Sequence, residues 1–281
     1  ALGYWSPPLR ARPAAPPIAP GGLELVSVPG GAVPIGAGAD ARFAYDNEKP
    51  QHQVEVEEFM IGRGPVTNED WRAFVADGGY ARREWWSPEG WDWRTDEAVE
   101  RPLQWRDGDL EQRLDGLHPI EGAAPVVHVS FFEAEAFARA RGVRLPSEPE
   151  WELAATWDGA RKRAYPWGDE PPDEDRANLI EAGAFAPLPA GSLPGGAAPC
   201  GALAMIGDVW EWTASEFHGY PGFAAYPYRE YSEVFFGPDY RVLRGGSFAA
   251  SADVVTPTFR NWDYPRRRQI FAGLRVAADA S

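Results

Sequence analysis

Few residues of this 281-residue chain have the spacing that metal or nucleophilic chemistry needs. The histidines are His52, His118, His128 and His218. No two of them form an H-x-H or H-E-x-x-H pair, and none lies at a helical i, i+3 or i+4 spacing from another. Transition-metal sites usually contain at least one such close pair, so the spacing predicts that this chain alone builds none. Cys200 is the single cysteine, and no basic residue near it in the sequence would activate its thiol. We interpret it as a small buried apolar residue.

Residues 218–236 are the most aromatic stretch of the chain, and they are rich in Tyr and Phe. The rings follow neither a helical nor a strand period, which is typical of a loop. Aromatic faces in a loop can line a pocket for a cationic or flat ligand through cation–π contact. Equally, the loop could fold onto the domain surface and be held there by its own rings. The sequence leaves both interpretations open.

A second polar and aromatic stretch, residues 259–263 (FRNWD), places an amide, an indole and a carboxylate side by side. Three arginines follow at positions 266–268. Neighbouring groups of both charge signs could hold a zwitterion such as an amino acid. Alternatively, Asp263 could pair with one of the arginines. For the arginine run itself, a solvated or structurally paired segment is favoured over an anion site.

The overall charge narrows the possible partners. The chain has 27 basic and 42 acidic residues and a formal charge of −15. Such a surface repels phosphate backbones, so nucleic-acid binding is not expected. No apolar run is long enough to span a bilayer and no signal-peptide pattern opens the chain, so we expect no membrane partner and a cytoplasmic protein.

The first 22 residues differ in composition from the rest. Residues 3–22 contain six prolines and end in two glycines, which is typical of an extended linker. The first residue is Ala1 rather than methionine. We therefore predict a linker over residues 1–22 and a folded domain over residues 23–281, and we expect another domain to precede them.

Three sequence patterns predict short helices. Each begins with a capping box, in which a Ser or Thr is followed three residues later by an acidic residue: Thr67 and Asp70, Ser130 and Glu133, Ser147 and Glu150. Residues 52–61 alternate as one half-buried strand would, and residues 240–243 and 272–276 have the composition of late strands. Between about residues 160 and 240 we expect mainly loop. Short helices, few strands and many turns indicate an α+β fold.

Taken together, several motifs resemble the formylglycine-generating-enzyme domain superfamily. They are RLPSEPEWELAA (144–155), YPWGDEPP (165–172), GDVWEWTAS (207–215), RVLRGGSF (241–248) and GLRVA (273–277). The resemblance covers nearly all of residues 23–277. It implies a C-type-lectin-like α+β fold with little regular secondary structure.

The chain departs from the sulfatase-activating members of that superfamily. These members need a cysteine pair near the segment after RGGSF, but here that segment reads AASADVVTPTF. Oxidation of a sulfatase cysteine is therefore not expected. Many members take calcium ligands from an asparagine-rich stretch before GDVWEW; here it reads APCGALAMIG, so a calcium site at this point is not expected.

Further motifs resemble the ergothioneine-type sulfoxide synthases, which join a thiol to N-α-trimethylhistidine (hercynine). They are YDNEKPQHQVEV (45–56), WWSPEGWDWR (85–94), VHVSFFEAEAFA (127–138), PGFAAYPYREYSEVFF (221–236) and FRNWDYPRRRQIFAGLRVA (259–277). The resemblance implies iron(II)- and O2-dependent C–S bond formation with sulfoxidation, using cysteine or γ-glutamylcysteine as the thiol. In such enzymes a preceding DinB-type helical domain supplies three histidines to the iron. No H-x-x-x-H-x-E motif of that domain occurs here.

The same resemblance assigns roles to residues of this chain. Tyr228 matches the tyrosine that faces the reacting oxygen and serves as an acid or hydrogen donor, which a protonated phenol can do. Tyr231 matches a second pocket tyrosine. Asn261, Trp262 and Asp263 match the segment that lines the substrate site, where Asp263 would hold the ammonium group of the thiol substrate. The aromatic loop, residues 218–236, would contact the trimethylammonium group.

Two other functions remain open. The chain could be a stand-alone lectin-like binding module without catalysis. It could also be part of a related synthase that uses another thiol or a selenol donor. The presence of both Tyr228 and Asp263 favours an enzyme over a binding module that has lost its chemistry.

Overall fold

The computed structural model describes residues 23–41 and 43–280, so the linker expected over residues 1–22 lies outside the described residues. In chain order, the helices and strands are β1 (Leu25–Val28), β2 (Gly31–Ile35), β3 (His52–Val56), β4 (Phe59–Gly62), α1 (Asn68–Ala76), α2 (Pro88–Asp96), β5 (Trp105–Arg106), β6 (Leu110–Arg113), β7 (Gly116–Pro119), α3 (Phe131–Ala140), α4 (Glu148–Thr156), β8 (Trp210–Phe217), β9 (Gly237–Arg244), β10 (Asn261–Asp263), β11 (Ala272–Leu274) and β12 (Ala277–Asp279). Most of the remaining described chain is turn and loop. The α+β class is therefore confirmed.

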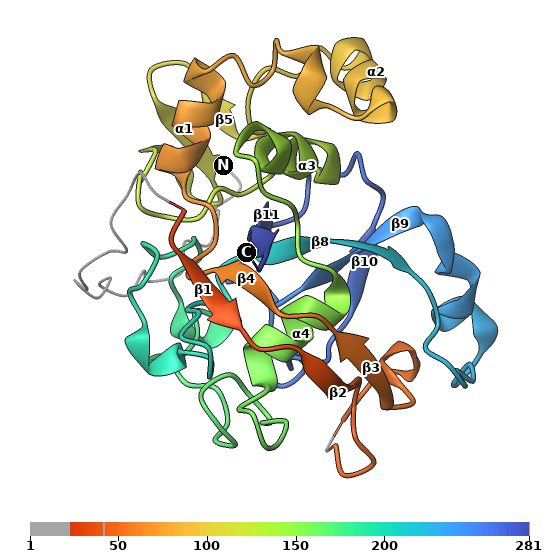
Figure 1. Ribbon diagram of the computed structural model, residues 1–281. Helices are drawn as coiled ribbons and strands as arrows, with labels where there is room; N and C mark the ends of the chain where they lie inside the picture. Colours follow the sequence, from red (N-terminus) through yellow and green to blue (C-terminus); the bar gives the residue numbers. More distant parts are fainter. Residues whose placement is uncertain (1–22, 42, 281) are drawn as a thin grey trace, which may run out of the picture.

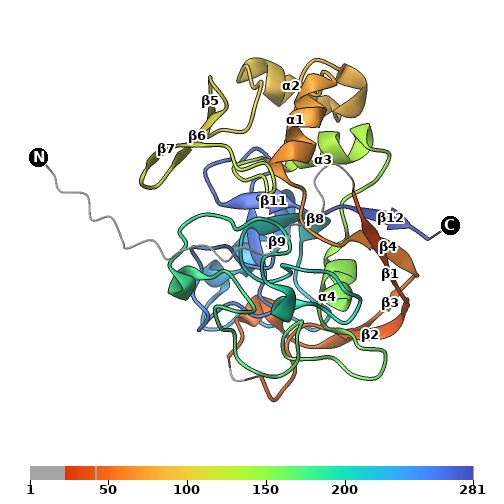
Figure 2. The same cartoon turned by 90° about the vertical axis from the view of Figure 1, so that its left-hand side faces the viewer.

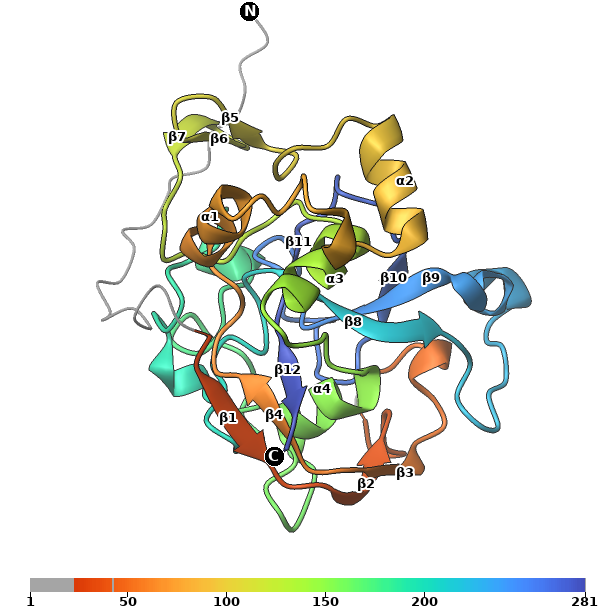
Figure 3. The same ribbon diagram turned by 45° about the horizontal axis from the view of Figure 1, so that its top comes forward.

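A four-stranded sheet in the order β10-β9-β8-β11 lies at the centre of the molecule (Figure 1). Two smaller sheets, β1-β4-β12 and β2-β3, lie beside it. Helices α1, α2 and α3 gather at one end of the molecule, whereas α4 lies toward β2 and β3 (Figures 1 and 3). The third small sheet, β5-β6-β7, lies next to α1 at the same end as α2 (Figure 2).

The three helices predicted from capping boxes are confirmed. The Thr67 side chain accepts a hydrogen bond from the Asp70 backbone N–H, and the Asp70 carboxylate accepts one from the Thr67 backbone N–H. The boxes at α3 and α4 are built in the same way. Such caps satisfy backbone N–H groups that have no partner inside the helix. Helix α2 was not predicted, although Ser87 caps it and Pro88 occupies its first turn.

One prediction about strands was wrong, and the stretch expected to be mainly loop contains one long strand. Residues 52–61 form not one strand but two, β3 and β4, which belong to different sheets. Within the stretch expected to be loop, Trp210–Phe217 forms the long strand β8. This strand lies between β9 and β11, and it carries the buried Glu211, whose carboxylate accepts hydrogen bonds from Arg275 and Trp151. A buried acidic residue removes the simple alternation that marks a half-buried strand.

A network of buried charges lies between α4 and the end of β9. Glu148 accepts hydrogen bonds from Arg244 (2.9 Å) and from Arg260 (2.7 Å), and the next turn of α4 presents Glu152 to Arg244 and Lys162. The two arginines and both glutamates are almost fully buried. Buried charges are tolerated only when they are paired and hydrogen-bonded. This network therefore fixes Arg260, the residue directly before β10.

No helix among the described residues is long and apolar enough to cross a membrane.

Candidate functional site

The rings of residues 218–236 fall into two groups. Phe236 packs edge-on against the buried Phe217 with 5.0 Å between centroids, and Phe223 packs against Phe236 at 4.9 Å. Tyr226 and Tyr228, by contrast, are 76% and 57% exposed. The phenylalanines therefore hold the loop on the domain surface, as one interpretation predicts, while these two tyrosines face outward. Contact of the loop with a cationic ligand stays a prediction.

Tyr228 and Tyr231 lie in one cluster of rings contributed by distant parts of the chain. Tyr231 stacks on Tyr45 with 5.6 Å between centroids, and Tyr228 meets Tyr231 edge-on at 6.1 Å. Phe259 packs edge-on against Tyr45 at 5.4 Å and Trp210 lies 5.5 Å from Phe259. We call Tyr45, Trp210, Tyr228, Tyr231 and Phe259 the tyrosine face.

The phenol of Tyr231 is held in its protonated form. Burial, together with the neighbouring Tyr45, raises the pKa of Tyr231 to about 12. At neutral pH its hydroxyl therefore remains a hydrogen-bond donor, and it adds no negative charge to the tyrosine face.

The Asn261–Asp263 segment forms β10, which pairs antiparallel with β9. Because side chains alternate along a strand, Asn261 and Asp263 project from one face and Trp262 from the other. Trp262 stacks on Phe217 at 4.2 Å and lies 5.6 Å from Phe235 of the aromatic loop. One face of the indole is therefore covered within the chain, and the indole joins β10 to the loop.

Asp263 pairs with a neighbouring arginine, one of the two alternatives for this residue. Its Oδ1 atom accepts hydrogen bonds from the Tyr264 backbone N–H (2.8 Å) and from Arg267 Nε (3.1 Å). Arg268 forms a 3.0 Å ion pair with the buried Glu133, and Arg266 is exposed. The prediction of a solvated or paired arginine run is confirmed. The Asp263–Arg267 pair still presents both charge signs at the surface.

The tertiary structure brings together residues from distant parts of the chain that no sequence pattern combines. Tyr45, Trp210 and Phe259 were not predicted as site residues. Each lies within a motif noted for its family resemblance, 45–56, 207–215 or 259–277, but their proximity to Tyr231 depends on long-range packing. Their position within these motifs was the only feature of the sequence that could have pointed to these three residues.

The histidines contact the protein rather than one another. His128 is largely buried, its Nδ1 lies 3.2 Å from the Arg268 carbonyl oxygen, and burial lowers its pKa. His52 Nδ1 lies 3.3 Å from the Pro50 carbonyl oxygen. Both side chains therefore lie within hydrogen-bonding distance of backbone carbonyl groups of this chain. Within residues 23–41 and 43–280, no three His, Cys, Asp or Glu side chains are grouped to hold a metal ion. These residues therefore do not fit an iron centre.

Cys200 is half-buried. Its Sγ lies 3.3 Å from the Ala154 carbonyl oxygen, and it packs against the apolar core. Burial raises the pKa of the Cys200 thiol. A raised pKa disfavours the nucleophilic thiolate, in agreement with an apolar role.

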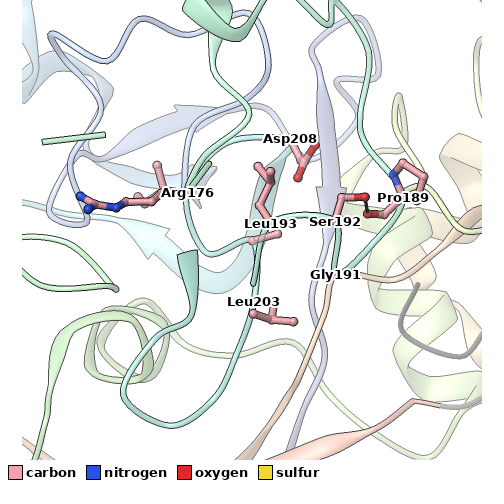
Figure 4. Close-up of a pocket in the computed structure, with 9 residues that line it drawn as sticks. Arg176, Pro189, Gly191, Ser192, Leu193, Leu203 and Asp208 are labelled. Carbon is pink, nitrogen blue, oxygen red and sulfur yellow. Dashed lines mark hydrogen bonds between the residues drawn. The ribbon is translucent and has the colours of Figure 1, made fainter. Parts of the chain in front are cut away.

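Two hollows are lined by residues outside the tyrosine face. One, of about 10 Å³, is bordered by Ser192 and Asp208, with the Arg176 guanidinium pointing away (Figure 4). It has roughly the space of a single water molecule. The other, of about 340 Å³, is lined by residues of the 172–182 segment and Ala252. Neither includes a residue predicted from the sequence to bind substrate.

Comparison with known proteins identifies relatives of this chain. Residues 16–280 match the sulfatase-modifying factor enzyme 1-like domain. The chain is 51% identical to the hercynine oxygenase of Mycolicibacterium thermoresistibile over 86% of its own length and 55% of that protein. It is 50% identical to the hercynine oxygenase of Mycobacterium tuberculosis over 86% of its own length and 57% of that protein. The chain thus spans little more than half the length of these two relatives.

A solved structure supports the fold. The structure of PvdO from Pseudomonas aeruginosa superposes with a TM-score of 0.66 at 21% identity, over 95% of this chain and all of that one. At this identity the similarity concerns the fold alone. It agrees with the formylglycine-generating-enzyme fold expected from the motifs.

Proposed function

The chain belongs to the sulfatase-modifying factor enzyme 1-like family, and on that premise we propose that it is the substrate-binding and proton-donating part of a hercynine oxygenase. The enzyme would couple hercynine to cysteine or γ-glutamylcysteine, with iron(II) and O2, to form a sulfoxide. The observation that supports this proposal most is the packing of the tyrosine face. Tyr228 meets Tyr231, and Tyr231 stacks on Tyr45. Tyr45 in turn packs against Phe259, which lies two residues before the strand β10 that carries Asp263.

Hercynine carries a trimethylammonium group, which cannot donate a hydrogen bond. Aromatic faces bind such cations through the negative face of the ring. Tyr45 stacks on Tyr231 with 5.6 Å between ring centroids and packs edge-on against Phe259 at 5.4 Å, and none of the three rings is fully buried. We propose that this part of the tyrosine face, with the aromatic loop, contacts the trimethylammonium group.

The thiol substrate carries an ammonium group, for which Asp263 is the proposed partner. The Asp263 carboxylate is already oriented by Tyr264 N–H and Arg267. A charge-assisted hydrogen bond from the ammonium would use its remaining acceptor capacity. Tyr228, whose ring is mostly exposed, would supply the proton or hydrogen atom during coupling.

Since the described residues do not fit an iron centre, the iron ligands in this proposal come from another domain, of the DinB type, fused or separate. That iron would supply the O2 chemistry when bound. This chain contributes binding, orientation and a donor hydroxyl.

The first prediction concerns this chain on its own. Incubated with Fe(II), O2, hercynine and either thiol, it should bind little iron and form no sulfoxide, because no group of ligands among its described residues can hold the metal. Mass spectrometry of the products and metal analysis after gel filtration would measure both. Addition of a DinB-type iron domain should restore turnover. Turnover by the chain alone would contradict the proposal, and hercynine binding without coupling under any reconstitution would support a binding module instead.

The second prediction concerns thiol recognition. Asp263→Asn should raise KM for the thiol substrate about 10- to 100-fold in the iron-containing enzyme, because a charge-assisted contact to the ammonium is lost. KM for hercynine should change little. Asp239→Asn, at an exposed position of β9, serves as the matched control and should leave both constants unchanged. An equal rise in both KM values for Asp263→Asn would argue against a specific role in thiol binding.

A further inference from the structure

A short turn, residues 45–48, lies between the two segments that carry the proposed site. Residues Asp46–Glu48 form a single 3-10 turn between β2 and β3. In Figures 1 and 3 this orange turn lies beside the light-blue loop that precedes β9. Tyr45 belongs to the tyrosine face, but no role in binding or catalysis has been assigned to Asp46, Asn47 or Glu48, and all three are buried.

The Asp46 carboxylate holds the aromatic loop at two points. Its Oδ2 accepts a hydrogen bond from the Tyr226 backbone N–H (3.2 Å), and its Oδ1 accepts one from the Ser232 hydroxyl. These two contacts flank the stretch that contains Tyr228 and Tyr231. Asp46 is 7% exposed and Ser232 is fully buried, so water cannot readily replace the contacts.

Asn47 connects the same loop to the strand β10. Its Nδ2 donates a hydrogen bond to Ser232 Oγ (3.1 Å), and its backbone carbonyl oxygen accepts one from Arg260 (2.8 Å). Arg260 is fixed by Glu148 and directly precedes Asn261. The turn therefore connects the loop that carries the tyrosines to Arg260, which belongs to the buried charge network and precedes β10.

The loop lacks the backbone support that β10 has. Strand β10 pairs with β9 along its length. In the loop the backbone hydrogen bonds are local, such as those from Tyr231 to Tyr228 and from Phe235 to Ser232. Local bonds shape a loop but do not attach it to the domain, so its position depends on side-chain contacts.

We propose that Asp46 is a positioning residue, which sets where Tyr228 and Tyr231 stand relative to β10. Asp46 does not touch substrate; it acts through the Tyr226 N–H and the Ser232 hydroxyl. The catalytic meaning of this position rests on the proposed function, whereas the position itself is a property of the chain that can be measured without any ligand.

The test is hydrogen–deuterium exchange of the 281-residue chain, read by mass spectrometry over residues 224–236. In Asp46→Ala the amides of this loop should exchange about 10- to 100-fold faster, because two hydrogen bonds to a charged acceptor are lost. Amides of β8 and β9 should keep their wild-type rates. Asp46→Asn retains one carbonyl acceptor and should give an intermediate rate.

Asp70→Ala is the matched control, since Asp70 also accepts two hydrogen bonds, both from Thr67 at the start of α1. It should accelerate exchange in α1 only. Unchanged exchange over 224–236 in Asp46→Ala, or an equal increase throughout the chain, would overturn the proposal. If Asp46→Ala does not fold, Ser232→Ala removes one of the two contacts of Asp46 with the loop. Faster amide exchange over residues 224–236 in that variant would support the proposal, and unchanged exchange would overturn it.

A kinetic measurement then separates this proposal from the proposed function. In the iron-containing enzyme, Asp46→Ala should lower kcat for coupling about tenfold or more with KM for the thiol unchanged, since Asp263 is held by β9 rather than by the loop. A rise in KM for the thiol with kcat unchanged would contradict a positioning role. If the wild-type enzyme makes no sulfoxide at all, the proposed function fails while the exchange measurement still decides the role of Asp46.

Discussion

Tyr228→Phe is expected to slow C–S coupling about 10²- to 10³-fold in the iron-containing enzyme, a typical contribution of a positioned proton donor. Hercynine binding should change little, because the phenyl ring that remains keeps its edge-on contact with Tyr231 at the 6.1 Å spacing. No hydrogen bond joins the Tyr228 hydroxyl to another described residue, so its removal should leave the fold intact. Single-turnover product assays and calorimetry with hercynine would measure the two effects.

Tyr226→Phe provides the matched control for this substitution. Tyr226 lies two residues earlier in the same loop and is more exposed than Tyr228. The Tyr226 hydroxyl has no proposed role, and the contact with Asp46 is made by the Tyr226 backbone N–H, which the substitution keeps. The control should retain wild-type coupling. Equal losses of hercynine binding and of coupling in Tyr228→Phe would count against a donor role, since they would indicate lost binding rather than lost proton transfer.

Glu148→Ala is expected to lower the free energy of unfolding by about 3–5 kcal/mol, because it removes the shared partner of two buried guanidinium groups. Arg260 donates to both Glu148 carboxylate oxygens, at 2.7 and 2.9 Å, and Arg244 donates to one of them. The loss is a large fraction of the stability of an ordinary domain. Urea unfolding followed by circular dichroism would measure it.

Glu24→Ala tests whether the loss of any ion pair has this effect. Glu24 pairs with Arg63 at 2.9 Å, but both side chains are about half exposed. An exposed pair contributes little, because water screens it and the side chains lose entropy in forming it. Glu24→Ala should therefore barely move the urea midpoint. A similarly small change in Glu148→Ala would show that the buried network does not support the fold as its geometry indicates.

Local interactions made part of the fold predictable. The capping boxes at Thr67, Ser130 and Ser147 involve residues three positions apart, so their helices could be recognised without any knowledge of the rest of the chain. Strand β8 could not be recognised in this way. Its buried Glu211 is stable only because Arg275, 64 residues later, neutralises it, and that partner is invisible in the local pattern.

The proposed site was likewise predictable only in part from the sequence. The sequence by itself determined which residue types are available: the phenols of Tyr228 and Tyr231, and the amide, indole and carboxylate at positions 261–263. Their motifs also carried the family resemblance. The sequence alone also left two alternatives for Asp263, and the structure shows that it pairs with Arg267 four residues later.

Only the tertiary structure decided how these groups stand together. Tyr231 lies against Tyr45, and the loop that carries it is held by Asp46, which is 186 residues away from Ser232 in the chain. No local pattern encodes such contacts, because they join segments far apart in the sequence and depend on the packing of the whole domain around them. The sequence therefore determined the chemistry that the site can offer, and long-range packing determined its geometry.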